Sequence, residues 1–283
     1  MSEIRYCPLS QVDFEAFTAA FNRAYSDYLM PVVMTSASFR ALMARDDLDP
    51  AASVVALDGD TIVGTGLLGL RAPIGWIGGM GVIPGYRRRG IGRQMMIYLL
   101  ERAREHGLSK VGLEVIEANH GAHALYYQLG FVDTRYLLIL ERIPTSLPDL
   151  PPTYRVEEQA PEDLLEYYDA FHDVPNCWQR HRASLVGLSP HLEGWAVWFG
   201  NQVAGYAVGM ANHHEVRLAD LAADPNSDRV LAAQTLLVYL HEHHWSAYSS
   251  IYNISEDDPV LPAYQATGYT TVMRQIEMEY TLK

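Results

Sequence analysis

The sequence predicts a mixed α/β protein of the α+β class that contains two copies of one folding unit. Residues 144–152 include four prolines and divide the 283 residues almost in half. Proline removes a backbone donor and favours an extended spacer, and similar motifs recur in the same order on both sides. We therefore expect domains at 1–143 and 153–283 joined by a linker at 144–152. One large domain with chance internal similarity is the alternative.

Each half begins with a short strand and an apolar helix and continues with a hairpin. Two apolar runs around a glycine turn are the signal for such a hairpin. Proline, tyrosine and glycine motifs then follow in both halves, and matching residues of the two halves are separated by a nearly constant number of positions, as expected for an internal repeat. The first elements are matched by Arg5 with Arg155 and Phe21 with Phe171, and the hairpins are expected at 54–64 and 195–205.

In the first half, a glycine-rich strand leads through a basic turn into a long helix. Residues 76–83 form an apolar run that Pro84 ends. From Ile91, apolar residues recur at three- and four-residue spacing until Gly107, which favours an amphipathic helix with a glycine stop. The sequence "GYRRRGIGR" is therefore a turn from strand to helix.

This turn has the properties of a phosphate site. The first amides of a helix have no intrahelical acceptor and carry the positive end of the helix dipole, so they suit an anion. Gly90 and Gly92 let the backbone approach a ligand, and the arginines add charge-assisted hydrogen bonds. No Lys-Ser or Lys-Thr follows the glycines, so the turn is not a Walker loop.

A second strand and helix follow the long helix. Residues 110–116 alternate as a strand that presents Glu114 on the face opposite its apolar side chains. Asn119 lies where a helix cap is needed, and apolar and tyrosine residues follow at helical spacing until Gly130.

These elements resemble the GNAT acyltransferase superfamily, which transfers acetyl from acetyl-CoA. The R-x-x-G-x-G pattern lies at 87–92, and an Asn-His-Gly-Ala motif at 119–122 is followed by Leu-Tyr-Tyr-Gln-Leu-Gly-Phe at 125–131. The resemblance covers residues 4–142. It implies two tandem GNAT-like domains, each a twisted, mostly antiparallel sheet flanked by helices.

The resemblance also implies a set of site residues. Backbone groups of Gly81, Val82 and Ile83 would pair with the pantetheine arm of acetyl-CoA, and Asn119 would contact the cofactor. Tyr126 would donate a proton to the leaving thiolate. Arg87 would also bind the cofactor. The pyrophosphate would be held by the backbone amides of Arg88, Arg89, Gly90, Ile91, Gly92 and Arg93.

Transfer to an amine needs two further functions. A backbone N–H, expected from Val82, stabilises the oxyanion, and a base accepts the proton of the amine. Glu114 and Glu117 are the candidate bases because they are the carboxylates nearest the motifs. His120 or a residue before the Pro73 turn is an alternative.

The second half repeats the fold signals without the phosphate chemistry. Asp228 replaces the first arginine of the basic turn, Leu231 replaces Gly90 and Ala233 replaces Gly92, although Tyr264 repeats the position of Tyr126. An aspartate repels a pyrophosphate and a leucine obstructs backbone approach. We expect a degenerate copy that does not bind CoA.

Histidine clusters at 213–214 and 241–244 suggest a metal, but the second is not H-E-x-x-H because Trp245 occupies the required histidine position. We expect no metal. The two cysteines are far apart and form no C-x-x-C pair.

A net charge of −13 argues against nucleic acid as a partner. No apolar run of transmembrane length and no signal-peptide pattern is present, so we expect a cytoplasmic protein without a membrane partner. The predicted function is acetyl-CoA-dependent N-acetyl transfer to a small-molecule amine, with the active site in the N-terminal domain. A peptide or protein N-terminus is the alternative acceptor, and a non-catalytic CoA-binding sensor is the alternative function.

Overall fold

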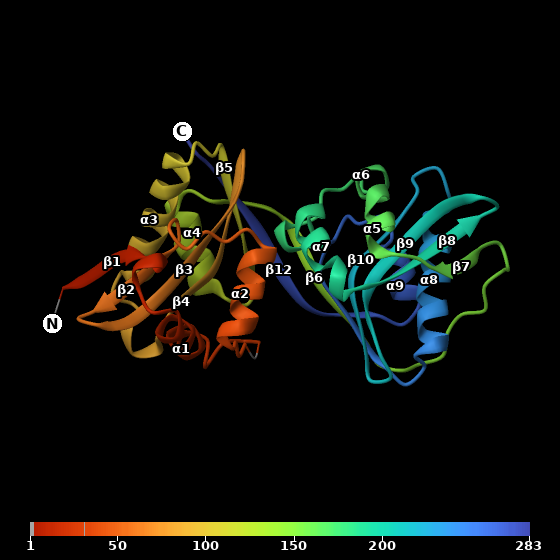
Figure 1. Ribbon diagram of the computed structural model, residues 1–283, viewed down its shortest axis with the longest axis horizontal. Coiled ribbons are helices and arrows are strands. Elements are labelled where there is room, and N and C mark those ends of the chain that lie inside the picture. The colour runs from red at the N-terminus through yellow and green to blue at the C-terminus, as the bar shows by residue number, and fades with distance from the viewer. Residues whose placement is uncertain (1–2, 31) are drawn as a thin grey trace. The chain divides into compact units, whose positions relative to one another are not determined.

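The computed structural model describes residues 3–30 and 32–283, and the chain divides into two compact units (Figure 1). The first unit runs to Thr134 and also contains Glu277–Lys283, and the second is Arg135–Ile276. The predicted boundaries at 143 and 153 therefore differ from those of the units. The proline-rich segment lies inside the second unit, and the chain changes unit within two strands, β6 (Val132–Arg142) and β12 (Thr270–Thr281).

Strand pairing explains this difference. In the second unit, β6 pairs antiparallel with β11 (Tyr248–Ser255), so that Leu140 lies opposite Ile251. In the first unit, Lys110 forms an ion pair of 2.6 Å with Glu279, and the amide of Leu282 donates to the carbonyl of Ser109. These partners are more than a hundred residues apart in sequence, and a comparison of internal repeats does not reveal them.

The first unit is a twisted sheet in the order β1-β2-β3-β4-β5, followed by the C-terminal part of β12. Its elements are β1 (Ile4–Pro8), η1 (Leu9–Gln11), α1 (Phe14–Ala24), α2 (Ser36–Arg45), β2 (Val54–Asp58), β3 (Thr61–Arg71), β4 (Ile74–Val82), η2 (Pro84–Tyr86), α3 (Ile91–Glu105), β5 (Lys110–Ile116) and α4 (His120–Leu129).

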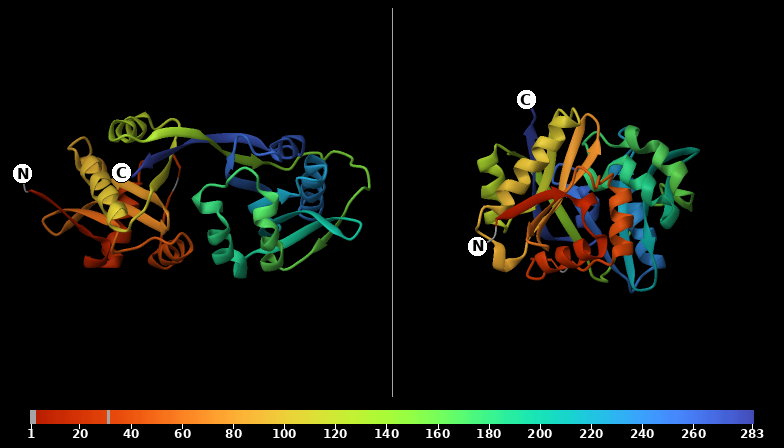
Figure 2. Two further views of the ribbon diagram at one scale, coloured as in Figure 1. Left: turned by 90° about the horizontal axis from the view of Figure 1, so that it is seen from above. Right: turned by 60° about the vertical axis from the view of Figure 1, so that its left-hand side comes forward.

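Helices cover both faces of this sheet (Figures 1 and 2). The side chain of Asp13 caps α1 by accepting from the amide of Ala16, and α2 begins with a capping box. Aromatic residues of α1 and α2 pack against one face of β2 and β3 in a continuous core. On the other face, a Cβ added at Gly64 would meet Met95 of α3 at 2.9 Å, so this glycine lets the long helix approach the sheet.

The second unit has the strand order β6-β11-β10-β9-β8-β7. Its other elements are β7 (Arg155–Glu158), α5 (Pro161–Leu164), η3 (Leu165–Tyr167), α6 (Tyr168–Phe171), η4 (Trp178–Arg180), α7 (Arg182–Leu188), η5 (Ser189–His191), β8 (Glu193–Phe199), β9 (Gln202–Ala211), β10 (Glu215–Ala223), α8 (Arg229–His243) and α9 (Leu261–Ala266).

The two units repeat one topology, which confirms the predicted α+β class and the two-copy organisation. The expected hairpins are β2–β3 and β8–β9, both antiparallel and both with a register shift, after Ala56 and after Val197. The long helices α3 and α8 contain 15 residues each. Each unit also has a parallel pair, β4 with β5 and β10 with β11, and this pair positions the candidate site.

Candidate functional site

The site begins where two parallel strands stop pairing. β4 and β5 are paired only from Ile74 opposite Lys110 to Trp76 opposite Gly112. β4 continues to Val82, and a cavity of about 660 Å³ lies along its end. The amide of Ile83 donates to the carbonyl of Val63 on β3. Because successive residues of a strand point their amides in opposite directions, the N–H of Val82 points away from β3, toward the gap.

Most of the predicted site residues line this one cavity. Four predicted residues, counted over the described part of the chain, do not line it: Ile83, Arg89, Glu114 and Glu117. Those that line it are Gly81, Val82, Arg87, Arg88, Gly90, Ile91, Gly92, Arg93, Asn119 and Tyr126.

The N-terminus of α3 opens into the cavity without a side-chain cap. The cap residue is Gly90, at a φ of 78°, and no side chain hydrogen-bonds to the first turn. Arg88 also has a positive φ of 60°, and both Arg88 and Arg93 line the cavity. An uncapped helix N-terminus beside two guanidinium groups is an arrangement that attracts a phosphate or another anion.

Arg87 and Arg89 use their side chains within the protein. The guanidinium of Arg89 donates to the carbonyl of Gly85 at 2.8 Å and lies 5.0 Å from the centre of the Tyr86 ring. Arg87 forms an ion pair of 2.7 Å with Asp27. The four neighbouring arginines that look equivalent in the sequence therefore have different surroundings.

Tyr25, Tyr28 and Tyr126 also line the cavity. Tyr126 on α4 is buried, and desolvation by burial, together with Tyr28, raises the pKa of its phenol well above the ordinary value. The hydroxyl of Tyr25 donates to the carbonyl of Met80, and burial raises its pKa as well. Both phenols therefore stay protonated at neutral pH.

Asn119 contributes to the site through the start of α4. Its side chain accepts from the amide of Ala122 at 3.3 Å, as the cap prediction requires, and the residue also lines the cavity. This cap fixes the first turn of the helix that carries Tyr126.

Unlike the tyrosines, the candidate bases Glu114 and Glu117 do not line the cavity. The carboxylate of Glu114 accepts a hydrogen bond of 2.8 Å from the indole of Trp76. The single carboxylate that lines the cavity, counted over residues 3–30 and 32–283, is Asp27.

Sequence reasoning missed the residues that follow α1. Tyr25, Asp27, Tyr28 and Leu29 all line the cavity. The signal that could have found them is the run of aromatic and charged residues directly after an apolar helix, where the helical periodicity ends and the side chains have no expected place in a core.

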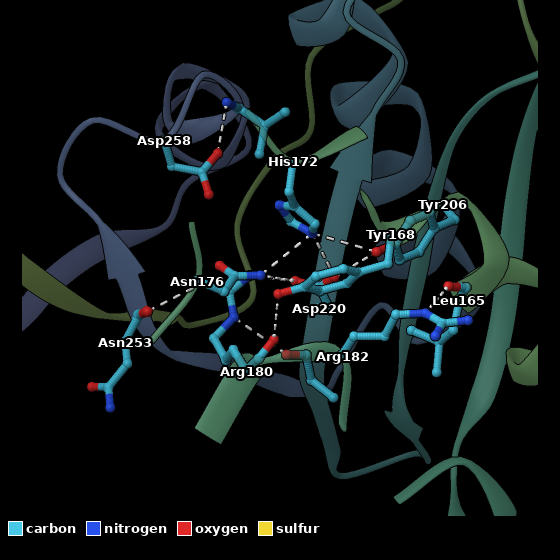
Figure 3. Close-up of polar contacts among 12 residues, drawn as sticks. Leu165, Tyr168, His172, Asn176, Arg180, Arg182, Tyr206, Asp220, Asn253 and Asp258 are labelled. Carbon is cyan, nitrogen blue, oxygen red and sulfur yellow. Dashed lines mark hydrogen bonds and ion pairs between the residues drawn. The ribbon is translucent and has the colours of Figure 1, made fainter. Parts of the chain in front are cut away.

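The second unit fills the equivalent gap with its own side chain (Figure 3). β10 and β11 pair only from Glu215 opposite Tyr248 to Leu218 opposite Ile251. Just beyond, Arg180 donates to the carbonyl of Ala219 on β10 and to the carbonyl of Asn253 on β11, each at 3.4 Å. The guanidinium therefore bridges the two strands where β4 and β5 leave a gap.

A buried carboxylate fixes this arginine. Arg180 also forms an ion pair of 2.6 Å with Asp220, which accepts from the hydroxyl of Tyr206 at 2.7 Å and lies 2.9 Å from His172. Asp220 is fully buried. Burial alone would raise the pKa of this carboxyl, but His172 and Arg180 lower it below the ordinary value.

In the second unit, the counterpart of α3 has a capped N-terminus. The carboxylate of Asp228 caps α8 by accepting from the amide of Leu231 at 3.0 Å. A negative charge of the protein therefore already lies at the position where α3 leaves its amides uncapped. Tyr264, the counterpart of Tyr126, is fully buried, and its hydroxyl has no hydrogen-bond partner among the described residues.

Residues 3–30 and 32–283 contain neither a metal-binding cluster nor a membrane-spanning helix. No three histidine, cysteine, aspartate or glutamate side chains there lie close enough to bind a metal ion. No helix in that part of the chain has both the length and the apolar character needed to cross a membrane.

Comparison with known proteins agrees with this geometry. Residues 14–131 match the Acetyltransferase (GNAT) family. A mycothiol acetyltransferase from Thermobispora bispora is 33% identical over 135 residues, which are 44% of this chain and 46% of that protein. The matched segment thus spans less than half the length of this curated relative.

Two solved structures extend the likeness over the whole chain at low identity. A tandem GNAT protein from the clavulanic acid biosynthesis pathway has a TM-score of 0.72 and 16% identity, with 99% of both chains covered. A GCN5-related N-acetyltransferase from Sphaerobacter thermophilus also has a TM-score of 0.72, at 13% identity, with 99% of this chain and 96% of that chain covered. Residues 14–131 are therefore similar to the acetyltransferase (GNAT) family, and the two units together have the fold of a tandem GNAT protein.

Proposed function

We propose that the protein is an acetyl-CoA-dependent N-acetyltransferase with one cofactor site, in the first unit, and with the amine of a small molecule as acceptor. One observation carries the proposal. A single cavity joins the uncapped N-terminus of α3, with Arg88 and Arg93 beside it, to the buried phenol of Tyr126.

The residues of this cavity fit the parts of acetyl-CoA. The amides at 90–93, with Arg88 and Arg93, suit a diphosphate. The unpaired edge of β4 near Gly81 and Val82 offers backbone groups to an amide-containing arm. Acetyl-CoA would supply the acetyl group as a thioester.

Val82 and Tyr126 would then perform different parts of the transfer. The N–H of Val82 points into the gap and would donate to the carbonyl oxygen that gains negative charge, a contribution worth about 2.7–4 kcal/mol in other oxyanion holes. The phenol of Tyr126, kept protonated by its burial, would donate its proton to the sulfur of the leaving thiol.

The acceptor must lose a proton before or during attack. In our proposal Glu114 or Glu117 accepts it through water, because neither side chain lines the cavity directly. The name of the relatives, mycothiol acetyltransferase, supports a small-molecule acceptor.

Two features of the second unit support a single site. Arg180 bridges β10 and β11 where an acyl thioester would have to lie, and the carboxylate of Asp228 occupies the N-terminus of α8. A diphosphate at that helix would meet a like charge instead of free amides.

Calorimetric titration of acetyl-CoA tests the proposal with two matched variants. Gly90→Leu places a side chain at a positive φ at the start of α3, and we expect it to abolish binding. Gly107→Leu imposes the same strain at the other end of α3, where φ is 69° and a Cβ meets nothing within 4 Å. We expect this control to bind like the wild type.

The wild type should bind one acetyl-CoA per chain. Two sites per chain would contradict the single-site proposal, and no binding would overturn the acetyltransferase proposal itself. Loss of binding in both glycine variants would assign the effect to strain in α3 and not to the phosphate turn.

A further inference from the structure

Arg87 connects three segments of the first unit. Its Nε donates to the carbonyl of Val82 at 2.9 Å, at the end of β4. Its Nη2 donates to the carbonyl of Ala24 at 3.0 Å, at the end of α1. The two terminal nitrogens also bind the carboxylate of Asp27 as a pair, at 2.7 and 2.8 Å.

These four hydrogen bonds use all but one of the N–H groups of a guanidinium. Arg87 therefore has little remaining capacity for the oxygens of a diphosphate, which bind best in the same paired geometry that Asp27 already occupies. The sequence predicts Arg87 as a cofactor-binding residue, but the contacts of its side chain indicate another role.

Through Asp27, Arg87 contacts the segment whose tyrosines line the cavity. Asp27 lies between Tyr25 and Tyr28, and with Leu29 these residues line the cavity; we name residues 25–29 the tyrosine loop. Tyr25 donates to the carbonyl of Met80, and its phenol interacts electrostatically with Tyr28 and with Tyr126. The loop is therefore fastened to β4 from one side by Tyr25 and from the other by Arg87.

The position of Arg87 in the chain gives this contact a functional meaning. It directly precedes Arg88, which lines the anion-binding end of the cavity. A ligand that orders the turn at 84–93 also orders the backbone of Arg87, and the paired contact transmits this order to Asp27. Paired arginine–carboxylate contacts are the ion pairs whose geometry carries measurable coupling even at partly exposed positions.

We propose that Arg87 is a positioning residue that couples occupancy of the phosphate turn to the tyrosine loop, so that the acceptor side of the cavity is completed when the cofactor is bound. This inference rests on the proposed function, because it needs CoA at the turn. It removes Arg87 from the residues that bind phosphate and adds Asp27 as its partner.

Hydrogen exchange measured by mass spectrometry tests the coupling without an acceptor. The readout is the ratio of exchange rates with and without CoA in peptides that cover 24–30, compared with peptides that cover 84–93. In the wild type, CoA at about 100 times its Kd should slow opening-limited amides by up to about 100-fold. Both regions should respond.

The variants separate a coupling role from phosphate binding. In Arg87→Ala and in Asp27→Asn, CoA should still protect residues 84–93 but should no longer protect 24–30. Asp27→Asn is decisive because it leaves Arg87 available to a phosphate. Arg89→Ala is the matched control, since Arg89 lies on the same turn but bonds to Gly85 and not to the loop; it should keep the response of residues 24–30 at saturating CoA.

Three outcomes contradict the inference. Unchanged protection of 24–30 in both variants would show that no coupling passes through this pair. If the variants speed the exchange of residues 24–30 by the same factor with and without CoA, the ratio of the two rates stays unchanged. That result would show that the pair only stabilises the loop. Loss of CoA binding in Arg87→Ala with normal coupling in Asp27→Asn would make Arg87 a phosphate ligand. Failure of the wild type to bind CoA is the separate result that overturns the proposed function.

Discussion

Tyr126 combines burial with access to the cavity. A phenol in this environment gives up its proton less readily than an exposed one, because its anion would lie in an apolar surrounding next to the other tyrosines. Its raised pKa keeps the proton available at neutral and moderately alkaline pH, when a sulfur leaving group develops negative charge.

We predict that Tyr126→Phe lowers the turnover of acetyl transfer by about 10²–10⁴-fold, the usual contribution of a positioned acid, with a smaller effect on CoA affinity. The wild-type rate should not fall as the pH rises through about 10, the ordinary pKa of tyrosine. The measurement is the pH–rate profile of CoA thiol release with an amine found by screening. A rate that falls with an apparent pKa below about 10 would contradict the assignment of Tyr126 as the acid.

Individual residues also show how far sequence reasoning reaches. Asn119 and Gly90 could be placed from local signals, because a helix cap and a helix start depend on neighbours in the chain, whereas the site role of Tyr126 came from the resemblance to a family. The contacts of Arg87 could not, since its partners Ala24 and Asp27 lie about sixty residues earlier. A run of similar arginines gives no local indication of which side chain faces solvent, protein or ligand.

At the scale of elements, the two parallel strand pairs differ in what lies between them. The gap between β4 and β5 leads into the cavity, whereas Arg180 bridges β10 and β11. Removing one partner of a buried ion pair leaves the other charge uncompensated, which costs about 3–5 kcal/mol. Replacing both partners removes that cost.

We predict that Arg180→Met destabilises the second unit by about 3–5 kcal/mol, and that the double variant Arg180→Met with Asp220→Asn is less destabilised than the sum of the single variants. Denaturant unfolding measures the stability. The thiol of Cys177 is buried and donates to the carbonyl of Asn253, so its rate of reaction with a thiol reagent reports on local opening of the second unit. This rate is measured in a Cys7→Ala background, so that only Cys177 reacts. A loss below about 1 kcal/mol in Arg180→Met would show that the bridge contributes little.

Element boundaries could be predicted more completely than element partners. The strand-to-helix turns, the hairpins and both long helices follow from periodicity and from glycine and proline positions. The degenerate turn at Asp228 was also visible, although its capping of α8 became evident only from the geometry. The position of Arg180 was not predictable, because η4 is a short 3-10 helix after an irregular segment, where no periodicity indicates which way a side chain points.

At the scale of the whole molecule, the first unit depends on residues from a distant part of the chain. Glu277–Lys283 belongs to the first unit. There, besides the ion pair of Glu279 with Lys110, the ring of Tyr280 lies 5.3 Å from that of Phe131 and its hydroxyl accepts from Arg104. The internal repeat predicted two units but assigned these seven residues to the other one.

We predict that a chain ending at Ile276 loses CoA binding, although no residue of the cavity has been removed, because the first unit loses an edge strand and its contacts. Calorimetry with CoA and thermal unfolding measure the effect. A chain that lacks only Leu282 and Lys283 is the control and should bind normally, since it keeps Glu279 and Tyr280. Wild-type affinity in the shorter chain would show that the first unit is complete without this segment.

The same segment determines the order in which the two units can complete their folding during synthesis. Domains usually fold in turn as they emerge during synthesis, at about 5–20 residues per second, and the N-terminal one folds first. Here the first unit receives its last strand only after residues 277–283 have been translated, when the second unit has already been made. The unit that is synthesised first is therefore completed last, and a nascent chain carries an unfinished sheet edge until residues 277–283 have been made.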